Sequence, residues 1–152
     1  MDETCASIYR LLSEARRELN RTIAGMRPDE MSVCMMEDWS VKDLLAHVAF
    51  WEEIAIPDFE RAARGHAPAL ANFDPKNVDT WSALAMSMRR RFSAEQVLFE
   101  LAAMREAMIA SLDYLPDTTF ASGWVPAYCA ISARHDRDHA KHIRDWRKKA
   151  GV

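Results

Sequence analysis

Residues 4–26 read TCASIYRLLSEARRELNRTIAGM, and the spacing of their apolar side chains decides the class of fold. Apolar residues recur every three or four positions, which is the period of one helix face. They are Ile8, Leu11, Leu12, Ala15, Leu19, Ile23 and Met26. The pattern predicts a long amphipathic helix over residues 4–26, with one apolar stripe that must pack against other helices.

A second helix is predicted to begin at Ser40. Ser40 and Asp43 have the spacing of a capping box, in which a hydroxyl accepts from the amide three residues on and a carboxylate reaches back. An apolar stripe follows as far as Phe59, and Gly65 ends the helix. Residues 27–39 lack sustained periodicity and are interpreted as a connection.

Residues 78–92 and 94–112 are again helical in period, with Ser93 and Gln96 as a second capping box between them. The sequence leaves open whether they form one bent helix or two. A last helix follows Gly123, and the stretch after the second helix is the expected crossover. Four principal helices with one long connection predict an all-α fold, an antiparallel four-helix bundle with a long crossover connection, as a single domain over residues 1–152.

The composition excludes several classes of protein. The chain of 152 residues is 49% hydrophobic but has only 4 Gly and 6 Pro, too few turn residues for an all-β fold. Its 20 Lys and Arg against 23 Asp and Glu give a net charge of −3, which offers no basic field to nucleic acid or to an anionic membrane. No run of about eighteen apolar residues occurs, and the opening MDET lacks the features of a signal peptide. We therefore expect a cytoplasmic protein with no nucleic-acid or membrane partner.

Three histidines stand on the inward stripe of the last helix. At about 100° per residue, His139 lies about 40° from His135 and His142 about 20° to the other side, so all three project in one narrow arc. Imidazoles four residues apart can grip one metal ion at N–metal distances of about 2.0 to 2.1 Å. The spacing therefore predicts part of a metal site, and it also allows His142 as a ligand.

His47 is the candidate for a third ligand. It follows Leu44 by three residues and precedes Trp51 by four, which places it on the inward flank of the second helix. Three nitrogen ligands from two helices leave coordination positions for water or substrate, which is typical of a catalytic metal site.

The alternative interpretation is structural. Acidic neighbours could make the last helix a solvated charged face on which the histidines are satisfied without a metal; they are Asp136, Asp138 and Asp145. In the same way, Arg89 to Arg91 are interpreted as a solvated helix end.

Two segments together resemble the DinB/YfiT-like metalloenzymes. They are residues 39–49, WSVKDLLAHVA, and residues 135–143, HDRDHAKHI, and the resemblance covers nearly the whole chain in helix order. It implies a four-helix bundle whose metal ligands are His47, His135 and His139. It leaves His142 outside the ligand set, so we expect His142 one turn deeper, as a packing or supporting residue.

Three neutral imidazoles with an open position suit Zn²⁺ or Ni²⁺, which can activate a bound water or thiol. The resemblance implies relatives that include mycothiol- or bacillithiol-dependent transferases and isomerases, and toxin-inactivating hydrolases. We therefore predict a metal-dependent enzyme that activates water or a low-molecular-weight thiol for hydrolysis or thiol transfer on a small electrophile. Glu52, Glu53 and Asp138 are candidates for a general base or a supporting partner, and solvated surface carboxylates are the alternative.

The second hypothesis is a non-catalytic metal-containing protein of the stress response, or one that binds a small molecule in the bundle cavity. It is kept because no acid–base pair beyond the ligands stands out. A homodimer is also compatible with the sequence, since five Trp and nine Met can furnish an apolar patch.

Overall fold

Helices make up most of the regular structure in the computed structural model, which describes residues 3–152. The helices are α1 (Glu3–Ile23), α2 (Pro28–Met31), α3 (Val41–Ala63), α4 (Val78–Arg89), α5 (Ala94–Leu112) and α6 (Trp124–Ala150). Short 3-10 turns lie at Ala69–Asn72, Pro75–Asn77 and Asp117–Phe120, and strands β1 (Cys34–Met36) and β2 (Trp39–Ser40) pair in an antiparallel hairpin. The predicted all-α class is confirmed. Met1 and Asp2, which belong to the opening segment used to predict a cytoplasmic protein, lie outside the described residues.

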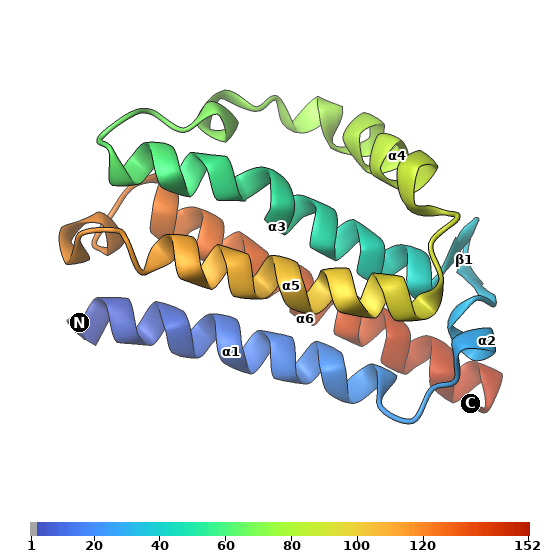
Figure 1. The fold of residues 1–152 in the computed structure, drawn as a ribbon. Coiled ribbons are helices and arrows are strands. Elements are labelled where there is room, and N and C mark those ends of the chain that lie inside the picture. The colour runs from blue at the N-terminus through green and yellow to red at the C-terminus, as the bar shows by residue number, and fades with distance from the viewer. Residues whose placement is uncertain (1–2) are drawn as a thin grey trace.

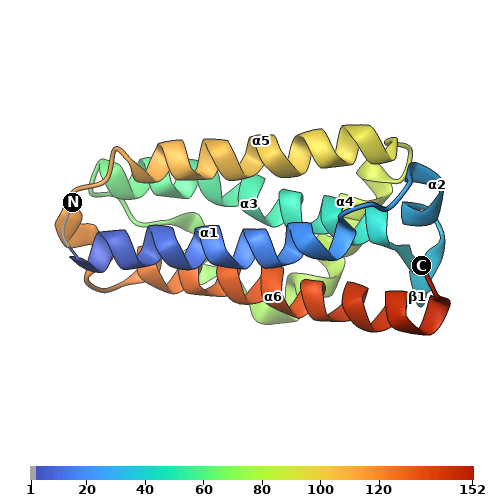
Figure 2. The same cartoon turned by 90° about the horizontal axis from the view of Figure 1, so that it is seen from below.

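Four long helices, α1, α3, α5 and α6, lie side by side (Figure 1). The most extensive contacts join α1 to α6 and α3 to α5, and α3 also contacts α6. Figures 1 and 2 show that α1 and α6 run in one direction while α3 and α5 run in the other. The connection from α3 to α5 therefore returns along the molecule, and α4 lies on its path against α3. Within residues 3–152, no helix has both the length and the apolar composition needed to cross a membrane.

Both predicted capping boxes are present. At the start of α3, the Asp43 N–H donates to Ser40 Oγ (3.2 Å) and the Ser40 N–H donates to Asp43 Oδ2 (2.9 Å). At the start of α5, the Gln96 N–H donates to Ser93 Oγ (3.1 Å) and the Ser93 N–H donates to Gln96 Oε1 (2.8 Å). Because α4 ends before this second box, residues 78–112 form two helices rather than one bent helix.

The first connection differs from the prediction in two respects. Helix α1 ends at Ile23 rather than Met26, because Gly25 adopts a φ of +77°, a conformation that breaks the helix and suits glycine. Residues 27–39, interpreted as an irregular connection, contain α2 and most of the β-hairpin. The hairpin brings Trp39 to the start of α3.

Asp58 fixes the crossover to α3. Its buried carboxylate accepts from the backbone N–H groups of Ala69 (2.9 Å) and Leu70 (2.7 Å) and pairs with Arg61. Burial works to raise the pKa of Asp58, but the two backbone hydrogen bonds and Arg61 hold it below its ordinary value. Asp58 therefore holds the first 3-10 turn after α3 against that helix.

A layer of four buried charges divides the core. Each long helix contributes one of them: Arg16 from α1, Glu52 from α3, Arg105 from α5 and Asp136 from α6. One apolar cluster, which includes Leu19, Leu44 and Val48, lies on one side of this charged layer, and the other lies towards the opposite end of each helix.

The charged layer is closely connected. Arg16 contacts Glu52 Oε1 (2.7 Å) and Asp136 Oδ2 (3.1 Å), and Arg105 contacts the same two oxygen atoms, each at 2.9 Å. The two guanidinium groups also donate to backbone carbonyls on each other's helices, those of Leu101 and Leu12. Two positive and two negative side chains therefore balance one another in the interior.

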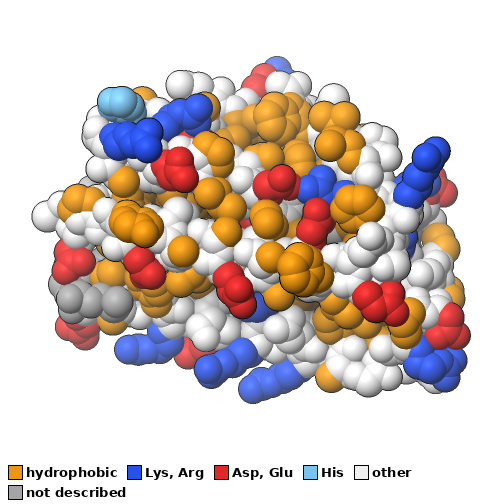
Figure 3. Space-filling view, in the orientation of Figure 1, with side chains coloured by type: hydrophobic (Ala, Val, Ile, Leu, Met, Phe, Trp, Pro, Cys, Tyr) orange, Lys and Arg blue, Asp and Glu red, His pale blue; other side chains and the backbone are white. Residues whose placement is uncertain are grey.

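The surface mixes charges of both signs with exposed apolar side chains. Figure 3 shows acidic and basic side chains interspersed on one face, with hydrophobic side chains between them. The exposed apolar residues include Leu84 and Met88 of α4 and Phe99 of α5.

Candidate metal centre

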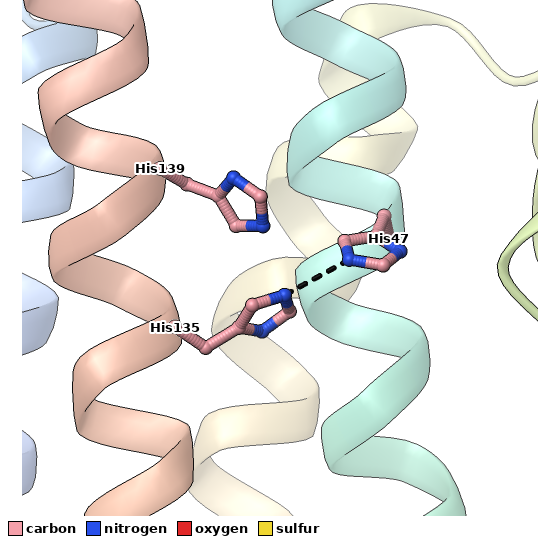
Figure 4. A group of neighbouring side chains, drawn as sticks. All are labelled: His47, His135 and His139. Atoms are coloured by element: carbon pink, nitrogen blue, oxygen red, sulfur yellow. Dashed lines mark hydrogen bonds between the residues drawn. The ribbon is translucent and has the colours of Figure 1, made fainter. Parts of the chain in front are cut away.

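His47 on α3 and His135 and His139 on α6 point toward one another (Figure 4). One ligand nitrogen from each ring lies within 4.8 Å of the other two, so small side-chain rotations would bring all three to the N–metal distances of about 2.0–2.1 Å that one ion requires. The Nε2 atoms of His47 and His135 are 2.9 Å apart and share a hydrogen bond whose donor depends on the tautomers. The ring of His139 is centred 5.3 Å from that of His47 and 4.4 Å from that of His135.

Local structure sets the position of His47. The cap at Ser40 fixes where α3 begins, and His47 follows in the second turn on the face that α3 buries. The indole of Trp39, delivered by the hairpin, meets the imidazole edge to face with ring centroids 5.1 Å apart. Trp51, one turn further along α3, flanks it at 6.4 Å.

Burial keeps the three rings neutral. Burial, with a smaller contribution from His139, lowers the pKa of His47 to about 3. Burial also lowers the pKa of His139 to about 4, with His142 acting in the same direction and nearby carboxylates opposing it. The pKa of His135 lies well below its ordinary 6.5 because of burial, with His139 next in importance. Neutral imidazole is the form that binds a metal ion.

The unpartnered nitrogen atoms test whether a metal fits. His47 Nδ1 and both ring nitrogens of His139 are buried without a hydrogen-bond partner. Such an orphaned buried group costs about 1–3 kcal/mol. A divalent ion would give His139 a partner and would bring three neutral nitrogen ligands to one point. The three side chains therefore fit a divalent metal ion.

Two cavities meet at the histidines. The aromatic cavity, about 400 Å³, reaches His47 and His135 and is lined by the rings of four further residues, Trp51, Phe73, Trp124 and Tyr128. The α4 cavity, about 710 Å³, reaches His47 and His139 and is lined largely by residues of α4 and of the hairpin. His47 lines both cavities, so the candidate metal centre is reached from two separate spaces.

His142 does not occupy the deeper position expected for it. It is exposed, and its ring is centred 5.6 Å from that of His139. Three residues along a helix from His139, it is rotated about 60° away, toward solvent. The inward position is taken by Ile143, which is fully buried.

Glu52 is buried, which excludes its interpretation as a surface carboxylate. Glu52 is 2% exposed. Its Oε1 accepts hydrogen bonds from both arginines of the charged layer, whereas its Oε2 has no hydrogen-bond partner. It also lines the aromatic cavity with His47 and His135. Glu53 is half exposed and pairs with Arg89, while Asp138 is exposed.

Two charged residues that were interpreted as solvated are buried. Asp136, next to His135, is 0% exposed because it lies in the charged layer. Arg89 is buried between Glu53 and Glu100 and lies 5.5 Å from the ring centre of Phe50. Arg89 therefore attaches the end of α4 to α3 and α5 instead of ending in solvent.

Sequence reasoning missed Arg16 and Arg105, although a signal was available. Arg16 stands four residues after Leu12 and three before Leu19, both fully buried. Arg105 stands in the same way between Leu101 and Met108. A charged residue four positions after one buried residue and three positions before another lies on the same helix face as both, so it must itself face inward.

Together these features define a predominantly helical protein with a buried to partly buried three-histidine group between two of its long helices. The family model of the DinB superfamily matches residues 11–143, which include all three histidines. The chain belongs to this superfamily, which confirms the resemblance seen in the sequence.

Among solved structures, the crystal structure of an uncharacterised protein from Escherichia coli UTI89 is similar, with a TM-score of 0.83 over 100% of this chain and 97% of that chain. At 14% sequence identity, this likeness concerns the fold. No curated protein matches the chain.

Proposed function

We propose that this protein is a metal-dependent enzyme built on a four-helix bundle, in which His47, His135 and His139 hold one divalent ion. The observation that carries the proposal is the convergence of three imidazoles, that of His47 buried and those of His135 and His139 partly buried, whose lowered pKa values keep them neutral and whose buried nitrogens include unpartnered ones. A ligand set of nitrogen alone favours Zn²⁺ or Ni²⁺ over Mg²⁺ or Ca²⁺.

The reaction class we propose is hydrolysis or thiol transfer on a small electrophile. A divalent ion held by these residues supplies Lewis-acid chemistry and lowers the pKa of water or of a thiol. The chain contributes two cavities that share His47, one reaching His139 and the other His135, so a nucleophile and an electrophile can approach from two sides. The rings of the aromatic cavity give one of these approaches largely apolar walls.

Glu52 favours catalysis over the non-catalytic alternative. It lines the same cavity as His47 and His135, and its Oε2 is buried without a hydrogen-bond partner, which a donor group of a reactant at this wall would supply. Oε1 of this carboxylate serves the charged layer, so the support for catalysis is the second oxygen, Oε2, which the layer leaves without a partner.

The test is turnover by protein loaded with Zn²⁺ or Ni²⁺. A panel of low-molecular-weight thiols with an aryl halide covers thiol transfer, and activated esters cover hydrolysis. We expect activity that is lost in His47→Ala but kept in His66→Ala. The second substitution is the control, because His66 is exposed and is not one of the three candidate ligands. Fully loaded protein without turnover in either assay contradicts the enzyme and favours a metal protein without catalysis.

A further inference from the structure

We propose that the aromatic cavity binds a flat aromatic group of the substrate that carries an O–H or N–H donor directed at Glu52. The inference rests on the proposed function in one respect, since it takes this cavity as the substrate side of the metal centre. Its three supports are the walls, their rigidity and the acceptor on Glu52.

The walls come from two pairs of aromatic rings. Trp51 and Phe73 meet edge to face with ring centroids 5.6 Å apart, and Trp124 and Tyr128 lie at 4.9 Å with an angle of 32° between their planes. The remaining lining is mostly aliphatic, and the volume of about 400 Å³ suits a small molecule of one or two rings. Extended ring faces favour a flat, apolar ligand.

The walls are held in place without a ligand. The Tyr128 hydroxyl donates to the backbone carbonyl of Trp51, so this hydroxyl is engaged and α6 is tied to α3 across the cavity. The two backbone hydrogen bonds of Asp58 anchor the crossover that carries Phe73. A preformed apolar space loses little entropy when a ligand enters it.

Glu52 gives the cavity its polar specificity. Oε1 is occupied by Arg16 and Arg105, which leaves Oε2 as a buried acceptor without a donor. A site with an unpaired buried acceptor discriminates strongly in favour of a ligand that supplies the donor. The α4 cavity differs, because charged and hydroxyl side chains contribute to its lining; they include Glu37, Asp79, Ser87 and Arg90.

Indole and 1-methylindole form a matched pair of probes, since they differ in the N–H donor. Binding is measured by equilibrium dialysis on the protein as purified. We expect saturable binding of indole at one site per chain, and binding of 1-methylindole at least about tenfold weaker, as for the loss of one hydrogen bond to a charged partner. Equal affinity for the two probes would overturn the role of Glu52, and the absence of saturable indole binding would overturn the proposal itself.

Substitutions at exposed positions locate the site without disturbing the core. Ile131 lines the aromatic cavity and is 49% exposed, so Ile131→Arg can fold and obstruct it. The matched control is Leu84→Arg, at an exposed position on α4 that lines neither cavity. We expect indole affinity to fall at least about tenfold in Ile131→Arg and to stay unchanged in Leu84→Arg. An equal effect of the two substitutions would place indole elsewhere and contradict the proposal.

The metal content of each sample separates this proposal from the proposed function. Indole binding in protein that holds no metal would support the proposed ligand of the aromatic cavity and contradict the proposed metal centre. Metal-loaded protein that binds no indole would do the reverse.

Discussion

His47 links the packing of the protein to its proposed chemistry. Its ring lies against Trp39 and Trp51, and the same burial that packs it lowers its pKa. His139 has two buried nitrogens without partners, so in the absence of a metal the group is a weak point of the fold.

This arrangement predicts how the stability of the metal-free protein depends on pH. The histidines have an ordinary pKa of 6.5 when unfolded, but about 3 and about 4 for His47 and His139 in the folded state. The folded state therefore binds fewer protons, and stability is complete above pH 6.5 and is lost as the pH falls from there toward 4. The slope is up to about 1.4 kcal/mol per pH unit for each histidine.

Urea unfolding of chelator-treated protein between neutral pH and pH 5 measures this slope. The control is a variant with His47→Gln, His135→Gln and His139→Gln, whose curve is expected to be flatter over the same range. Parallel curves for the two proteins would contradict the origin of the effect in these histidines.

At this scale the sequence predicted which histidines come together, and it missed the buried acceptor. His47, His135 and His139 follow from helical spacing and from the family motifs, and the structure brings them together; their role as ligands stays a prediction. The burial of Glu52 depends on partners 36 and 53 residues away in the chain, which no local pattern identifies.

The starts of α3 and α5 are the helix boundaries that the sequence predicts best. The capping boxes at Ser40 and Ser93 are read from residues three positions apart, and both form. Helix α2 and the hairpin were missed because elements of two to four residues are too short to show a period.

Loss of the cap at Ser93 should destabilise the protein measurably. Ser93→Ala removes the acceptor for the Gln96 N–H at the start of α5, and we expect a cost of about 1 kcal/mol in the free energy of unfolding. Ser93→Asp, which restores a capping oxygen, should recover most of it. Ser87→Ala is the control, since this exposed serine bonds only within α4, and chemical denaturation compares the three variants. The same cost for Ser87→Ala and Ser93→Ala would count against the capping role.

Across the whole molecule, the charged layer joins all four long helices beside the candidate metal centre. Glu52 follows His47 along α3, and Asp136 follows His135 directly on α6, so the layer fixes the two helices that carry the histidines relative to each other. Its net charge is zero, and each guanidinium bridges both carboxylates.

Removal of one charge from this layer should therefore be costly. Arg105→Met leaves two buried carboxylates with one arginine, and we expect a loss of about 3–5 kcal/mol in the free energy of unfolding. Arg137→Met removes a partly exposed arginine paired with Glu18, for which about 0–1 kcal/mol is expected. Similar losses in the two variants, measured by urea unfolding, would show that the layer is not an integrated network.

Association of two copies stays a prediction at this scale. Leu84 and Met88 on α4 and Phe99 on α5 are exposed apolar side chains that such a contact could cover. Sedimentation velocity at several protein concentrations distinguishes a monomer from a homodimer.

Elemental analysis of untagged protein, purified without metal-affinity resin, tests the three-histidine metal centre most directly. The account predicts close to one Zn or Ni ion per chain in the unmodified protein and in His66→Ala, and close to none in the double variant His135→Ala/His139→Ala. No retained metal in the unmodified protein after incubation with Zn²⁺ and Ni²⁺, or equal metal in the double variant, would contradict it.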